Sequence, residues 1–107
     1  MTIKYKNAKV DLTTADATAV LTPDNATTAI INSILVSEDS GNADTIDLTI
    51  TDSASAVFSL FKVKAVGANT TIELLTKPLV LAESEILKAE AATAHRLHVV
   101  ASYMEIS

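Results

Sequence analysis

Hydrophobic and polar residues alternate along much of this chain. The clearest example is residues 45–51, where Ile46, Leu48 and Ile50 are separated by Asp47 and threonines. Successive side chains of a strand point to opposite faces of a sheet, so this pattern predicts a strand with one buried face. Further strands are predicted at 29–36, 57–66, 70–74 and 97–106, with weaker candidates at 9–13, 17–22 and 79–81.

The spacing of these segments predicts the fold class. Strands near every ten residues, with turns between them, are typical of a sandwich or barrel. We expect an all-β fold: an antiparallel, jelly-roll-like β-sandwich of about eight strands. Residues 29–36 and 97–106 are apolar on much of both faces, so we place them mid-sheet. Residues 1–16 are polar and weakly patterned, and we interpret them as an extended N-terminal arm before a sandwich domain at 17–107.

Residues 82–92 carry two conflicting signals. The segment consists of strong helix formers, and Ser84 is a suitable helix cap. No helical stripe of large apolar residues follows the adjacent Ile86 and Leu87, however. We favour a strand at 85–90 over a helix.

Composition and charge narrow the function classes. The 107 residues include no Cys and no Trp, and aromatic residues make up 4%. Thiol chemistry and disulfides are therefore excluded, and aromatic platforms for sugars or bases are disfavoured. The net charge of −5 disfavours nucleic acid and anionic membranes as partners. The first residues lack a long apolar stretch, so we expect no secretory signal.

Few residues suggest chemistry. His95 and His98 would share a face on a helix, but on a strand they point apart, so we expect no shared metal site. The acidic loop at 38–44 lacks the EF-hand pattern; we interpret it as a hydrated turn, with calcium coordination as the alternative. We expect no catalytic residue, metal or cofactor, and no enzyme activity.

Phe58 and Phe61 are three residues apart, which on a regular strand puts them on opposite faces. One is then a core residue and the other is either core or an interface anchor, and we favour the core for both.

From about Ile30 to Ser107 the chain resembles a family of small bacteriophage virion proteins. The segments that carry the resemblance are Ile34-Leu35-Val36-Ser37, Asp47-Leu48-Thr49-Ile50-Thr51-Asp52-Ser53, Leu60-Phe61-Lys62, Gly67-Ala68-Asn69-Thr70-Thr71-Ile72-Glu73-Leu74-Leu75, Lys77-Pro78-Leu79-Val80-Leu81 and Leu97-His98-Val99-Val100-Ala101-Ser102-Tyr103-Met104-Glu105-Ile106-Ser107. The resemblance implies a β-sandwich component of a phage particle and brings no catalytic residues with it.

The resemblance leads to an expected function. We expect a capsid decoration or cement protein that binds other virion proteins, forms homo-oligomers and is assembled into the virion in the host cytoplasm. A neck, collar or tail accessory protein, including one that attaches fibres, is the first alternative. An extracellular adhesion or glycan-binding module is an alternative from another class.

Overall fold

The structure is a computed structural model that describes residues 1–107, and it contains strands but no helix. The nine strands are β1 (Ile3–Asp11), β2 (Thr18–Leu21), β3 (Thr28–Glu38), β4 (Asp44–Thr51), β5 (Val57–Val66), β6 (Thr71–Glu73), β7 (Leu79–Leu81), β8 (Ile86–Ala91) and β9 (Leu97–Ile106). The chain accordingly has no helix that is long and apolar enough to cross a membrane. The predicted all-β class is confirmed.

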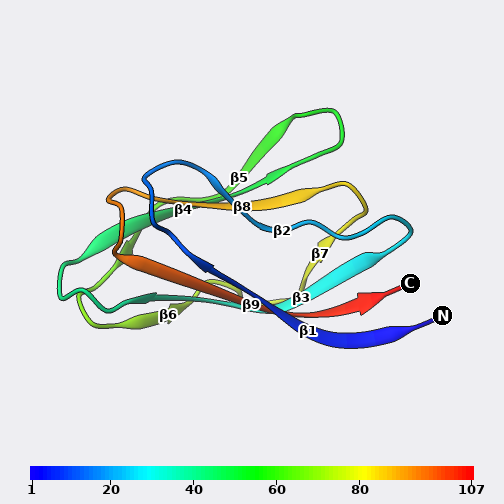
Figure 1. The fold of residues 1–107 in the computed structure, drawn as a ribbon, viewed down its shortest axis with the longest axis horizontal. Coiled ribbons are helices and arrows are strands. Elements are labelled where there is room, and N and C mark those ends of the chain that lie inside the picture. The colour runs from blue at the N-terminus through cyan, green and yellow to red at the C-terminus, as the bar shows by residue number, and fades with distance from the viewer.

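The strands form two antiparallel sheets that pack face to face (Figure 1). The first, sheet A, has the order β1-β9-β3-β6, with β7 also paired to β3. The second, sheet B, has the order β2-β8-β4-β5. If β6 and β7 are counted as one interrupted strand, this is the eight-stranded order of a jelly roll. The predicted sandwich is therefore confirmed, and β3 and β9 do lie mid-sheet.

The core lies between the sheets and is built from alternate residues of each strand. Its fully buried large side chains are Leu12, Ile31, Ile34, Val36, Ile46, Leu48, Val66, Leu81, Leu87, Leu97 and Val99. We call the face of each sheet that turns toward the other its inner face, and the opposite face its outer face. Aliphatic, largely β-branched residues suit such a thin two-layer core.

The ambiguous segment 82–92 contains β8, which confirms the strand prediction. Leu87, Ala89 and Ala91 are buried on the inner face, and they alternate with half-buried residues on the outer face. The strand also lies between β2 and β4 and pairs with both of them. These long-range pairings override the local preference for helix.

The N-terminal residues belong to sheet A. β1 pairs with β9 over nine consecutive residues without a register shift, and Leu12 just after it is fully buried. Thr2 and Ser107 exchange two backbone hydrogen bonds, of 2.8 and 2.9 Å, which hold the two ends of the chain side by side (Figure 1). The sheet thus begins before residue 17, inside the predicted arm at 1–16, and the strand predicted at 9–13 lies at 3–11. Contact of this segment with a neighbouring subunit stays a prediction.

A carboxylate fills the break between β6 and β7. β3 pairs with β6 through residues 35–37 and with β7 through residues 29–31. Between these stretches, Glu73 accepts hydrogen bonds from the Ser33 hydroxyl, from the Ile34 N–H at 2.7 Å and from the Leu75 N–H at 3.1 Å. Burial acts to raise the pKa of Glu73, but these hydrogen bonds outweigh it and lower that pKa. The Glu73 side chain therefore supplies hydrogen bonds to the stretch of β3 that pairs with neither β6 nor β7.

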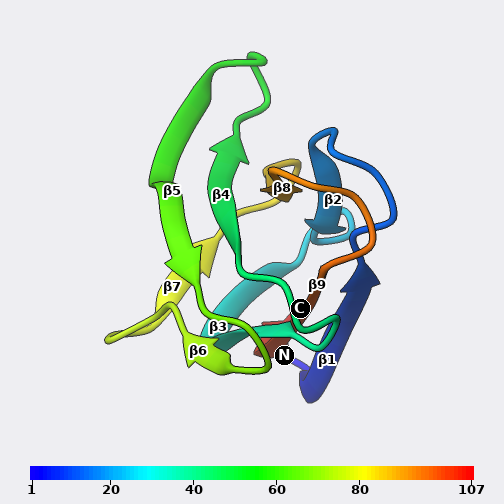
Figure 2. The same cartoon turned by 90° about the vertical axis from the view of Figure 1, so that its left-hand side faces the viewer.

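The β4–β5 hairpin extends beyond the rest of the sandwich, as Figure 2 shows at its upper end. The exposed apolar side chains of β5 are Val57, Phe58, Leu60 and Val63. Phe58 stays exposed because the end of this hairpin has no opposing strand of sheet A to cover it, whereas Val57, opposite Thr51, and Val63, beside Asp47, lie on the outer face of sheet B. We call these four residues the hairpin patch.

Candidate interaction surfaces

The outer face of sheet A carries a row of apolar side chains that crosses four strands. The strand register places Tyr5 opposite Met104, Met104 opposite Ile30, and Ile30 opposite Val80. Ile3 and Ile106 form a second pair beside this row. Cross-strand partners share a face of the sheet, so these six residues form one surface. We call it the terminal patch, because both chain ends lie next to it.

The terminal patch is open to solvent in the single chain. Tyr5 is 80% exposed, Val80 58% and Ile3 47%, and the other three members are half-buried. No charged residue belongs to the patch. Contiguous exposed apolar surface is where protein contacts are sought, so the terminal patch is the candidate interaction surface of sheet A.

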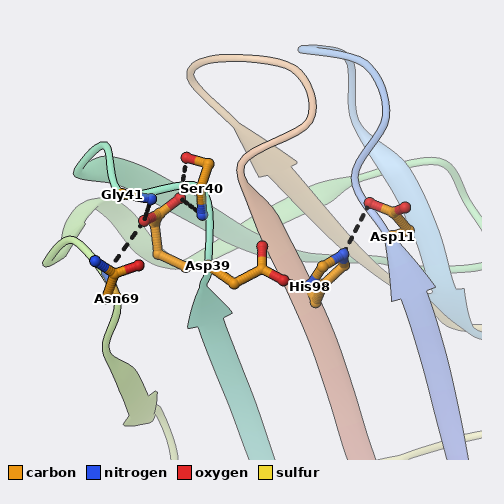
Figure 3. Close-up of polar contacts among 7 residues, drawn as sticks. Asp11, Asp39, Ser40, Gly41, Asn69 and His98 are labelled. Carbon is orange, nitrogen blue, oxygen red and sulfur yellow. Dashed lines mark hydrogen bonds and ion pairs between the residues drawn. The ribbon is translucent and has the colours of Figure 1, made fainter.

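The other end of the same outer face is polar. His98 of β9 lies between two carboxylates: its Nε2 is 3.3 Å from Oδ1 of Asp11, and its Nδ1 is 3.7 Å from Oδ2 of Asp39 (Figure 3). Both carboxylates are well exposed, so this end of the face is acidic. Because the two carboxylates approach opposite nitrogens of the ring, they do not converge on one point.

The two histidines do not form a shared site. His95 lies in the turn before β9, with a φ of +67°, and its N–H donates to the Leu12 carbonyl at 2.9 Å. Both nitrogens of His98 already face carboxylates. No group of three or more His, Cys, Asp or Glu side chains is arranged to hold a metal ion.

The acidic loop at 38–44 is organised by its own first residue. The Glu38 carboxylate is buried and accepts hydrogen bonds from the N–H groups of Ser40 at 2.9 Å, Gly41 at 3.0 Å and Asn69 at 3.1 Å, and from the Ser40 hydroxyl (Figure 3). Gly41, with φ of +85°, provides the left-handed turn that brings these N–H groups together.

The hydrogen bonds decide the charge of Glu38. Burial acts to raise its pKa, but the donors of Ser40, Asn69 and Gly41 outweigh it and lower the pKa from 4.5 to about 2. Asp44, at the other end of the loop, accepts the Thr93 N–H at 3.1 Å. These two carboxylates therefore bind backbone donors of their own chain, which favours the predicted turn over the calcium alternative.

Strand β5 is irregular, and this changes where its aromatic residues lie. The register pairs Leu48 with Phe61 and Ile50 with Phe58, with shifts on both sides of Leu48. An extra residue between the two phenylalanines returns both to the same face, so the prediction of opposite faces is wrong. Phe61 packs against the core, whereas Phe58 is 56% exposed at the overhanging end, so the prediction of core for both is wrong for Phe58.

The second irregularity of β5 is held by an aspartate. Val63 has a φ of +51°, which is strained for a β-branched residue, and its N–H donates to Oδ1 of Asp47 at 2.6 Å. Asp47 and Val63 also line a shallow cavity of about 210 Å³ on the outer face of sheet B. Its other lining residues are Ala15, Thr45, Glu90, Ala91 and Ala92. Asp47 is directly opposite Glu90 in the register, so the wall of the cavity is acidic.

The terminal patch is the surface that the sequence prediction missed. A signal for it does exist: the strand at 97–106 is apolar on both faces, although an antiparallel sandwich needs only one. Locating the patch requires the register, because Tyr5, Ile30, Val80 and Met104 are far apart in the sequence.

Taken together, the fold and these surfaces define a jelly-roll β-sandwich with exposed apolar patches on both sheets. No protein-family model matches the chain, and no curated protein matches it in sequence. One similar solved structure is that of the N-terminal Clostridium thermocellum endo-1,4-β-D-xylanase 10B, with its CBM22-1 and GH10 modules and xylohexaose. It is 9% identical with a TM-score of 0.48 over 95% of this chain, which spans only 24% of that chain.

A second similar structure is the cyanophage Pam1 capsid asymmetric unit. It is 18% identical with a TM-score of 0.44, over 95% of this chain and 84% of that chain.

Proposed function

We propose that this chain is a non-enzymatic structural protein of a bacteriophage virion, most specifically a decoration or cement protein that binds the capsid. It would act by adhesion: the terminal patch docks on neighbouring virion proteins and adds contacts that stabilise the particle. The resemblance of residues 30–107 to small phage virion proteins suggests the particle, and the structure suggests the surface.

The observation that carries the adhesive role is the cross-strand row Tyr5–Met104–Ile30–Val80. Tyr5 and Val80 at the two ends of this row are exposed to water in the single chain, so burying them against a partner is favourable. A partner surface that covers them removes their apolar area from water, and this stabilises the complex by about 25 cal/mol for each Å² of apolar surface buried.

The strand edges are less suited to docking than the faces. β2, β6 and β7 have only three or four residues each. β5 is interrupted by its register shifts and carries Lys62 and Lys64, and β1 carries three lysines. Short, bulged or lysine-bearing edges are the devices by which proteins prevent strand addition. We therefore assign the contact to a sheet face.

A binding assay with particles tests the proposal. Capsids that lack this protein are mixed with labelled wild type, pelleted, and imaged to locate the label. Tyr5→Asp (Y5D) places a charge in the terminal patch and should abolish co-sedimentation, whereas Ala17→Asp (A17D) adds the same charge at another exposed position and should not. Binding of Y5D at the wild-type level would overturn the docking surface. Label at the neck or tail would favour that alternative, and no binding to any part of the particle would reject a virion role.

A further inference from the structure

The molecule has two separate apolar patches, one on each sheet. The terminal patch lies on the outer face of sheet A, and the hairpin patch lies on β5 at the edge of sheet B. A two-fold symmetric dimer through either patch would leave the other uncovered in both copies. Contact between the terminal patch of one copy and the inner-side face of the hairpin of the next would cover the terminal patch and Phe58 together.

The size of the terminal patch indicates that a stable contact must extend beyond it. Its six side chains, one row of four and one pair, cover roughly 200 Å², given strands about 4.8 Å apart and same-face residues about 6.8 Å apart along a strand. A standard interface buries about 800 Å² on each partner. The contact must therefore continue along the outer face of sheet A, toward the end that carries Glu73 and Asp39.

One face of β5 carries an apolar residue and a basic residue, which correspond to the apolar and acidic parts of the outer face of sheet A. Phe58 and Lys64 share the inner-side face of β5, because they pair with Ile50 and Ile46. Lys62 and Lys64 are exposed and form no ion pair within the chain. In a protein of net charge −5, the free lysines of this strand are suited to an acidic surface.

The distance between Phe58 and Lys64 on β5 also matches the distance between the corresponding rows on sheet A. On β4, Ile50 and Ile46 are four residues apart, which puts Phe58 about 13 Å from Lys64 along the hairpin. On sheet A, the row through Met104 and the row through Val100 are also four residues apart, again about 13 Å. The first of these rows holds Ile30 and Val80. The second holds Lys9 on β1, Leu35 on β3 and Glu73 on β6, so its β6 end is acidic and its β1 end is basic. Glu73 stays ionised because its hydrogen bonds lower its pKa.

We propose that copies of this chain associate head to tail, with the β4–β5 hairpin of one copy lying across the outer face of sheet A of the next. Phe58 packs against the row of Met104, Ile30 and Val80, and Lys64 lies near the carboxylate of Glu73. Such a heterologous contact builds a closed ring or an open chain, not a two-fold dimer. The proposal extends the proposed function by naming a second copy as one partner, and it rests on the same terminal patch.

Mixing two variants distinguishes this arrangement from a two-fold dimer that uses only one of the two patches. Phe58→Asp (F58D) damages only the hairpin patch, and Y5D damages only the terminal patch. Each variant alone should be monomeric in sedimentation velocity, while an equimolar mixture should form heterodimers of twice the monomer mass that grow no further. A17D should associate like wild type, and circular dichroism should show that all variants fold.

A charge variant tests the polar half of the contact. Lys64→Glu (K64E) should raise the apparent Kd of association roughly tenfold and reduce its dependence on salt. Lys88→Glu, on the outer face of sheet B, is the matched control and should leave the Kd unchanged.

Three outcomes would overturn the head-to-tail contact: a wild-type chain that stays monomeric at every concentration, self-association of F58D at the wild-type level, or a mixture that forms no heterodimer. The proposed function is judged separately, by co-sedimentation with particles. A monomeric wild type that still binds capsids would reject the self-association and leave the virion role standing.

Discussion

Asp47 and Val63 are joined across the β4–β5 hairpin by a 2.6 Å hydrogen bond from the valine N–H to the aspartate Oδ1. The bond fixes Val63 in a left-handed conformation, with φ of +51°. A β-branched residue is strained there, at a cost on the order of 1 kcal/mol or more. The hairpin therefore contains local strain at its most exposed strand.

Glycine at position 63 should release that strain. Val63→Gly is expected to leave the free energy of unfolding unchanged or raise it, although glycine in a strand ordinarily costs about 1 kcal/mol. Val57→Gly is the matched control, since Val57 and Val63 lie on the same strand at 63% and 62% exposure. Urea denaturation should show the position-63 variant more stable than the position-57 variant by about 1–2 kcal/mol. Equal losses at both positions would contradict the strain.

Glu38 should make the protein sensitive to acid. Its pKa is lowered from 4.5 to about 2 in the folded chain, so its contribution to stability is complete above pH 4.5 and is lost as the pH falls toward about 2. Glu38→Gln should be less stable than wild type at neutral pH, and the gap should close across this interval. Denaturant titrations over the pH range measure it. A gap between Glu38→Gln and wild type that stays constant over the pH range would refute the assignment.

Thr51 has a buried hydroxyl without a hydrogen-bond partner. Replacing it by valine keeps the shape and removes the unsatisfied group, so Thr51→Val should raise the free energy of unfolding by about 1 kcal/mol. Thr49→Val, two residues away on the same strand, should change it by less than about 0.5 kcal/mol. Thermal denaturation of both variants is the measurement, and destabilisation by Thr51→Val would show that the hydroxyl is bonded.

The N-terminal segment should divide into a binding part and a folding part. Deleting residues 1–7 removes Ile3 and Tyr5 but keeps Leu12, so the sandwich should stay folded while capsid binding is lost. Deleting residues 1–16 also removes the fully buried Leu12 and should cost a further 2–5 kcal/mol or so of stability. Circular dichroism and particle co-sedimentation test both deletions. Wild-type binding by the shorter deletion would remove β1 from the docking surface.

The fold could be predicted because period-2 patterns reflect burial directly. Residues 45–51 and 97–106 show this: their apolar alternation marks strands that the structure contains as β4 and β9. The strand at 86–91 was ambiguous for the opposite reason, since its residues favour helix and only pairing with β2 and β4 decides the outcome.

The surfaces could not be predicted because they depend on register and on irregular backbone. No glycine marks the bulges of β5, so nothing in the sequence indicates that Phe58 and Phe61 return to one face. Likewise, Tyr5 and Val80 become neighbours only through β9 and β3 between them. Glu38 resembles an ordinary loop acid in the sequence, and only its burial beside Asn69 shows that it holds two loops together.

The paired ends of the chain have a practical consequence. Thr2 and Ser107 are bonded to each other beside Ile3 and Ile106, so anything fused to either terminus emerges in front of the apolar row. An affinity tag or fluorescent domain placed there would shield the surface it is meant to report on. A circular permutant that joins the two ends would leave that surface free for a capsid to reach.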